Sequence, residues 1–149
     1  VYIIGLDKLK AFQSGDNTKK LLTDTKEIVF PLYVGKVLKN ALSIRKRGGG
    51  WKTASIGSNE IHFLEPVRMK HSQENNIKVK SYYIVRVPAM YLRLLGYDKG
   101  GKTYLIPTHE ISDVKLDIGK SIPANDLYLK IKPLAAKYEN VLIPPKKTK

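Results

Sequence analysis

Residues 83–106 read YIVRVPAMYLRLLGYDKGGKTYLI and contain the signals that decide the fold. The β-branched and aromatic side chains at 83–87 predict a strand. That strand stops at Pro88, because proline suits the first turn of a helix. We expect a short helix over 89–95, ended by Gly96 in the left-handed conformation that glycine adopts at low cost.

The second part of this stretch predicts a turn and a returning strand. Residues 97–101 contain two adjacent glycines, and residues 103–106 are again aromatic and β-branched. The complete unit is too small to bury its own apolar face. It must therefore pack against a unit of similar build.

A looser version of the same order lies upstream. A strand at 28–30 leads into Pro31, and residues 32–42 have the composition of a helix. A basic glycine loop at 45–50 and a strand at 51–56 follow. The shared order of strand, proline, helix, turn and strand indicates an internal repeat.

These observations predict one domain over residues 1–149, built of two related halves at about 26–69 and 77–118. The fold class is mainly β with short helices (α+β), arranged as a pseudo-twofold β-barrel of swapped-hairpin or double-psi type. The remaining expected elements are strands at 1–4, 61–64, 77–80, 114–118 (paired with 103–106) and 127–131, a polar connector at 69–76, a helical turn at 134–138 and a basic tail at 144–149.

Positive charge is the strongest global property of the chain. Lysine and arginine number 27 against 13 acidic residues, which gives a formal net charge of +14. Such an excess is typical of nucleic-acid-binding proteins, because a polyanion offsets the self-repulsion of the surface. Only five of the 27 are arginines, so phosphate contacts are favoured over base-specific ones. Thermal adaptation also enriches lysine, but it normally adds acidic residues as well.

Residues 83–106 resemble the AbrB/SpoVT family of swapped-hairpin DNA-binding domains, and residues 28–64 resemble it weakly. The resemblance implies that exchanged hairpins close one small barrel and that basic residues near its edge meet DNA. The chain departs from the family pattern at Tyr83-Ile84, where members often carry Gly-Arg, and at Gly101, where they carry an acid. The matching residues are Val85-Arg86-Val87-Pro88, Leu92-Arg93, Leu95-Gly96, Asp98-Lys99-Gly100-Gly101 and Thr103-Tyr104-Leu105-Ile106.

The first candidate binding site is the basic glycine loop at 45–52. Its three glycines let the backbone approach a phosphate, and Trp51 can stack on an unpaired base. The loop lacks the GK[ST] ending of a P-loop, so it does not indicate nucleotide hydrolysis. The alternative is a mobile charged loop in which Trp51 anchors the core. The candidate residues are Arg45, Lys46, Arg47, Trp51 and Lys52.

Two further basic patches follow from alternation. Arg86 lies between two valines, so the pleat places it on the opposite face, where Lys78 and Lys80 share its parity. We expect this stripe to contact phosphate, with a solubilising outer face as the alternative. Arg93, together with Lys99 and Lys102, forms the second expected patch.

The sequence gives little support for catalysis. His62, His71 and His109 show neither HxH nor HExxH spacing, so no metal site is expected. The chain has no cysteine, which excludes disulfides and thiolate metal sites, and no apolar run reaches the ~18–20 residues of a membrane span. We therefore expect neither an enzyme nor a bound cofactor.

The predicted function is nucleic-acid binding, with double-stranded DNA as the favoured target. A cytoplasmic, nucleoid-associated transcription regulator or nucleoid-type protein fits this prediction, with a homodimer as one expected state and no membrane partner. Two alternatives remain open. One is an RNA-binding ribosomal or ribonucleoprotein component, and the other is a basic domain of a larger RNA-guided or mobile-element enzyme.

Overall fold

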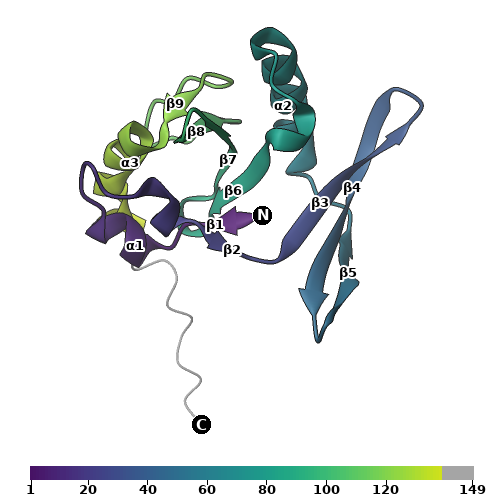
Figure 1. The fold of residues 1–149 in the computed structure, drawn as a ribbon, viewed down its shortest axis with the longest axis horizontal. Helices are drawn as coiled ribbons and strands as arrows, with labels where there is room; N and C mark the ends of the chain where they lie inside the picture. Colours follow the sequence, from purple (N-terminus) through teal and green to yellow (C-terminus); the bar gives the residue numbers. More distant parts are fainter. Residues whose placement is uncertain (139–149) are drawn as a thin grey trace.

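The structure, a computed structural model, describes residues 1–138, which form two separate β-sheets and three α-helices (Figure 1). The fold is mixed α+β, mainly strands with short helices, and this prediction is confirmed. Neither sheet is closed. Strands β2 and β9 are the edges of the larger sheet, and β3 and β5 are the edges of the smaller one. The predicted pseudo-twofold barrel is therefore not confirmed.

The larger sheet has six strands in the order β2-β1-β6-β7-β8-β9. Its neighbours pair antiparallel, except that β1 runs parallel to β6. The strands are β1 (Tyr2–Ile3), β2 (Thr23–Asp24), β6 (Tyr83–Val87), β7 (Leu92–Lys99), β8 (Lys102–Pro107) and β9 (Ile122–Pro123).

Helices cover both faces of this sheet. Val85 and Leu94 point to one face, where they join a core with side chains of α1 (Leu6–Ala11) and α3 (Ala124–Tyr138). Leu95 points to the other face and packs against α2 (Ile61–Asn75). Because β7 is enclosed on both sides over residues 94–97, this segment is fully buried and contains no charged side chain.

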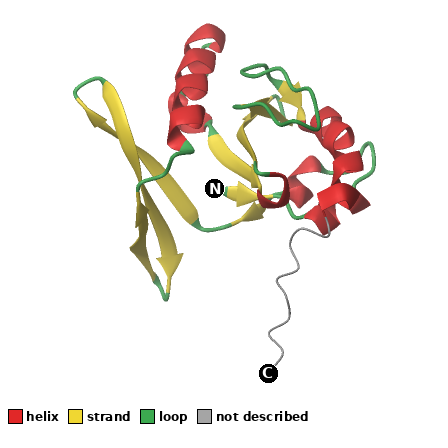
Figure 2. Cartoon of the chain, turned by 180° about the vertical axis from the view of Figure 1, so that it is seen from behind, coloured by secondary structure: helices red, strands yellow, loops and turns green. Residues whose placement is uncertain are grey.

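The smaller sheet is a meander of β3 (Glu27–Val34), β4 (Val37–Arg47) and β5 (Gly50–Ile56). It stands to the side of the larger sheet, and α2 leads from it back to the body (Figures 1 and 2). Gly35 has a positive φ in the first turn, and Gly48 and Gly49 both have positive φ in the second. Two such residues in a row match the tight turn that suits the twist of a hairpin.

The helix predicted at 32–42 is wrong, because these residues form most of the β3–β4 hairpin. Pro31 does not begin a helix. It lies inside β3 opposite Ala41, and an edge strand tolerates a residue without an N–H. The strand predicted at 61–64 and the connector predicted at 69–76 are also wrong, because both belong to α2.

The helix predicted at 89–95 is wrong as well. Pro88 begins only a single 3₁₀ turn, Pro88–Met90, and Tyr91 then takes a left-handed conformation with φ of 51°. Strand β7 starts directly afterwards and contains Gly96, whose φ is not positive. The shared strand–proline–helix order of the two halves is therefore wrong. Pro31 lies within a strand, and Pro88 is followed by one 3₁₀ turn and then by a strand.

Other predicted elements divide into wrong and confirmed ones. Residues 127–131 lie in α3, residues 79–81 form a 3₁₀ turn, and β8 pairs with β7 and β9 and not with 114–118. The basic tail at 144–149 lies outside the described residues. The confirmed elements are the strands at 1–4 (as β1), 28–30, 51–56, 83–87 and 103–106 and the helical character of 134–138.

Gly96 is required by a close side-chain approach. A Cβ at this position would lie 2.3 Å from Cε2 of Tyr83, the residue directly opposite in β6. The Tyr83 ring is held by an edge contact with Tyr2 and by a hydrogen bond from its hydroxyl to Asp98. We expect Gly96→Ala to lower the free energy of unfolding by about 1–3 kcal/mol, measured by urea denaturation.

The control variant is Gly50→Ala, because Gly50 also lies in a strand, has no positive φ and has open space around its Cα. It should change the stability little. In a Tyr83→Ala background the cost of Gly96→Ala should largely disappear. An equal cost in both backgrounds would show that the tyrosine ring is not the cause.

Candidate nucleic-acid interface

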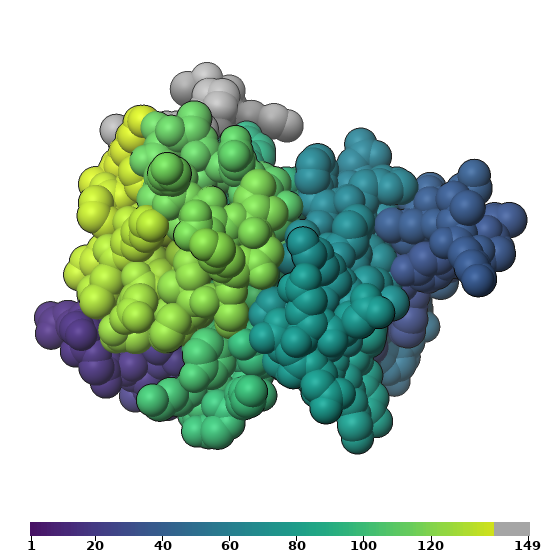
Figure 3. Space-filling view, turned by 90° about the horizontal axis from the view of Figure 1, so that it is seen from above, coloured from purple at the N-terminus to yellow at the C-terminus, as the bar shows by residue number. Residues whose placement is uncertain are grey.

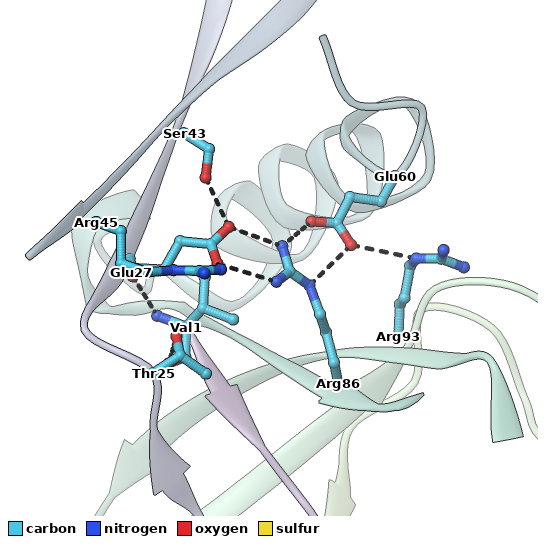
Figure 4. A network of polar contacts seen from close by, with 8 residues as sticks. All are labelled: Val1, Thr25, Glu27, Ser43, Arg45, Glu60, Arg86 and Arg93. Carbon is cyan, nitrogen blue, oxygen red and sulfur yellow. Dashed lines mark hydrogen bonds and ion pairs between the residues drawn. The ribbon is translucent and has the colours of Figure 1, made fainter. Parts of the chain in front are cut away.

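Arg86 joins the two sheets through two buried glutamates. Its guanidinium donates hydrogen bonds to both carboxylate oxygens of Glu27, at 3.3 and 3.4 Å, and its Nε donates to Glu60 at 3.0 Å (Figure 4). Nη2, one of the two nitrogens that bond Glu27, also donates to the other oxygen of Glu60. Glu27 begins β3 and Glu60 precedes α2, so one side chain of β6 connects three parts of the molecule.

Two more arginines complete this group. Arg45 lies opposite Glu27 in the β3–β4 pair and bonds it at 2.6 Å. Arg93 lies opposite Arg86 in the β6–β7 pair, and its Nε donates to Glu60 at 3.2 Å. Two arginines placed opposite each other repel, and Glu60 offsets this repulsion by bonding both. We call Glu27, Arg45, Glu60, Arg86 and Arg93 the charged seam.

The pKa of Glu27 is set by its neighbours in the charged seam. Burial alone would raise its pKa, but hydrogen bonds from the Ser43 hydroxyl and from the two guanidinium groups of Arg45 and Arg86 outweigh burial. The pKa of Glu27 is lowered to about 2 from its ordinary value of 4.5. The carboxylate is therefore charged at neutral pH, as two bound guanidinium groups require.

A second contact ties the smaller sheet to α2. The Tyr33 hydroxyl donates to the buried carboxylate of Glu65 at 2.5 Å, and Arg68 pairs with the same carboxylate at 2.5 Å. A cavity of about 180 Å³ lies between these groups and the charged seam. It is well below the ~300–1,000 Å³ of a typical small-molecule site.

The charged seam corrects part of the predicted nucleic-acid site. Arg45, Arg86 and Arg93 are engaged by glutamates inside the fold, so their charge is already offset and fewer of their N–H groups remain for a phosphate. The predicted stripe of Lys78, Lys80 and Arg86 is wrong, because 78–80 does not continue as a strand and Arg86 points into the seam.

The remaining predicted residues of the glycine loop do come together. Beyond Arg45, β4 and β5 continue without β3 as a two-stranded hairpin that turns at Gly48 and Gly49. Lys46 lies opposite Trp51 on one face, with Trp51 half exposed. Within residues 1–138 the side chains of this hairpin end form no ion pair or hydrogen bond. We call residues 46–52 the basic hairpin end; its candidate contacts are Lys46, Arg47, Trp51 and Lys52.

The other predicted lysines are exposed but separate from this hairpin. Lys78 directly precedes the 3₁₀ turn before β6, and Lys80 lies within it. Lys99 and Lys102 lie opposite each other where β7 turns into β8. Six positions along β7 separate Lys99 from Arg93, which is roughly 20 Å, so the predicted second patch does not form as one group.

The glutamates of the seam were not predicted from the sequence. Glu27 stands beside an apolar run and Glu60 in a polar turn, and neither has a motif that indicates burial. The one usable signal was Arg86 itself, an arginine between two buried valines in a strand. A buried arginine requires acidic partners, although their positions depend on the sheet pairing.

The structure gives no sign of a metal centre or a membrane span in the part of the chain that it describes. Across residues 1–138, no three His, Asp or Glu side chains are grouped closely enough to hold a metal ion. No helix in that range is long and apolar enough to cross a membrane.

Comparison with families of known proteins, with curated proteins and with solved structures finds no match for the chain. The resemblance of residues 83–106 to the AbrB/SpoVT family therefore stays a prediction.

The charged seam can be tested by removing one charge. Glu27→Gln keeps the size of the side chain but leaves Arg45 without a carboxylate and Arg86 with that of Glu60 alone, so we expect a loss of about 3 kcal/mol of unfolding free energy at pH 7. Because the pKa of Glu27 is lowered on folding, its stabilisation is complete above pH 4.5 and is lost as the pH falls towards 2. Urea denaturation at several pH values measures both effects.

The matched control is Glu74→Gln on α2, whose carboxylate is exposed and lies 3.9 Å from Lys70. This variant should lose less than about 0.5 kcal/mol. The difference in stability between wild type and Glu27→Gln should narrow between pH 4.5 and pH 2. A difference that stays constant over this interval would contradict the charge-based role of Glu27.

Proposed function

We propose that this protein binds nucleic acid through the basic hairpin end. The observation that carries the proposal is the convergence of Lys46, Arg47, Trp51 and Lys52 on a projecting two-stranded hairpin, with no internal partner for any of these side chains among residues 1–138. The rest of the lysine excess supports the same function, because it produces a positive field that attracts a polyanion.

The geometry of the hairpin suits a groove of duplex DNA. The major groove admits a two-stranded β-ribbon. Lys46 shares one face of the hairpin with Trp51, whereas Lys52 lies opposite Arg45 and points to the other face. Cations on both faces can reach phosphates on both walls of a groove, and the glycine turn lets the backbone come close to one. Binding would then release counterions from several phosphates.

Duplex DNA is the target we propose first, in line with the resemblance of residues 83–106 to a DNA-binding family. The same proposal includes a swapped-hairpin or double-psi arrangement. It also includes a nucleoid-associated location in the cytoplasm. Single-stranded nucleic acid, including RNA, is the second candidate. It is favoured by one observation: the half-exposed ring of Trp51 can stack on an unpaired base.

The test uses Lys46→Ala, Arg47→Ala and Lys52→Ala in one chain. Arg45 is left intact, because it holds Glu27 and its loss would weaken the fold. Fluorescence anisotropy with labelled duplex DNA, single strands and structured RNA is measured over a range of salt concentrations. We expect wild-type affinity to fall steeply with salt. For duplex DNA, the slope of log K against log salt should shrink by about 2–3 in the triple variant.

The matched control replaces the exposed residues Lys70, Lys115 and Lys130 by alanine, which removes the same charge elsewhere. This control should keep most of the affinity and most of the salt dependence. If both triple variants lose affinity equally, the hairpin end is not the site. If the wild-type protein binds none of the three nucleic acids, the proposed function is wrong.

A further inference from the structure

The smaller sheet has an apolar face that no part of residues 1–138 covers. The register places cross-strand rows of side chains on the side opposite Glu27 and Ser43. One row is Ile28–Ile44–Thr53, and the next is Phe30–Leu42–Ile56. Both ribbon views show no helix or strand against the outer side of this sheet (Figures 1 and 2). The outer face, as we call it, consists of Ile28, Phe30, Leu32, Leu42, Ile44 and Ile56.

The exposure of this face is large for a folded chain. Phe30 is 44% exposed and Ile56 is 74% exposed, and Ile28 and Leu32 are close to 40%. Together the six side chains present roughly 500 Å² of apolar surface, near the upper end of the largest patch that a monomer usually shows. The smaller sheet also projects from the body, as its blue hairpin shows in Figure 3. A single exposed layer of this kind normally needs a second layer.

We propose that the second layer is the same sheet of another copy of this chain. Two such faces would bury roughly 1,000 Å² in total, which reaches the lower limit of a specific interface. The apolar rows contain no charged side chain, so two basic chains can meet here without placing like charges in contact. Two copies of one sheet have the same twist, so they can pack face to face about 10 Å apart.

Twofold symmetry determines which residues meet. Leu42 lies in β4, the central strand of the sheet, and is the middle residue of the row Phe30–Leu42–Ile56. A twofold axis that runs across the strands through this row places Leu42 opposite its own copy and keeps Lys46, in the same strand, away from its own copy. The row of Lys46 and Trp51 lies at one end of the sheet, beyond Ile28–Ile44. The dimer therefore does not depend on nucleic-acid binding, and either proposal can fail alone.

The first experiment is sedimentation velocity of the full chain over a range of concentrations without nucleic acid. We expect a dimer for wild type. Phe30→Lys with Ile56→Lys should weaken self-association at least 100-fold, because two cations would enter each apolar layer. The control is Phe63→Lys with Met69→Lys on α2, where both side chains are similarly exposed, and it should remain dimeric. Circular dichroism checks that each variant is folded.

The second experiment remains informative if the lysine variant fails to fold. The chain has no cysteine, so Leu42→Cys carries a single thiol. A short bismaleimide should link two copies of this variant, whereas Ile118→Cys, exposed in a loop away from the sheet, should remain unlinked. A wild-type chain that stays monomeric at about 100 µM overturns the proposal. So does a dimer that survives the lysine changes, or equal cross-linking of the two cysteine variants.

Discussion

Burial of two glutamates around one arginine holds this molecule together. Arg86 is only partly accessible, and Glu27 and Glu60 are almost completely buried, so none of the three can recover its hydration in place. Buried charges are tolerated only when they are paired and hydrogen-bonded. The position of the smaller sheet against the body is thereby fixed by a polar contact, supported by the Tyr33–Glu65 bond, and only to a smaller degree by apolar packing.

Local signals in the sequence were sufficient for some elements and not for others. The strands at 83–87 and 103–106 were predicted because β-branched residues there are bounded by proline and glycine. The segment at 92–95 was misread, because the three-residue spacing of Leu92 and Leu95 also fits one face of a helix, whereas in the structure Leu94 and Leu95 are buried on opposite faces of a strand. Alternation at 127–131 was equally misleading, since Leu127, Tyr128 and Ile131 are the buried positions of one helical face.

The candidate site was predicted in part for a related reason. Residue type identified the glycine-rich hairpin, but charge alone could not separate structural cations from free ones. Four of the five arginines pair with buried glutamates. The partner of Arg68 is three residues away in the same helix, but those of the other three lie far away in the sequence, and only the tertiary fold brings them together. The planar guanidinium suits such buried bidentate contacts, whereas lysine is left mostly for the surface.

The two edges of the smaller sheet differ in a way that bears on its behaviour at high concentration. Strand β3 contains Pro31, which has no N–H to offer to an incoming strand. Strand β5 has no proline, and nearly all of its residues are exposed. Lys52 is its one charged residue, and charge is a common guard against unwanted pairing. Misassembly by strand addition should therefore occur at the β5 edge only. Once two β5 edges have paired, only the β3 edges remain, so we expect short aggregates and not fibrils.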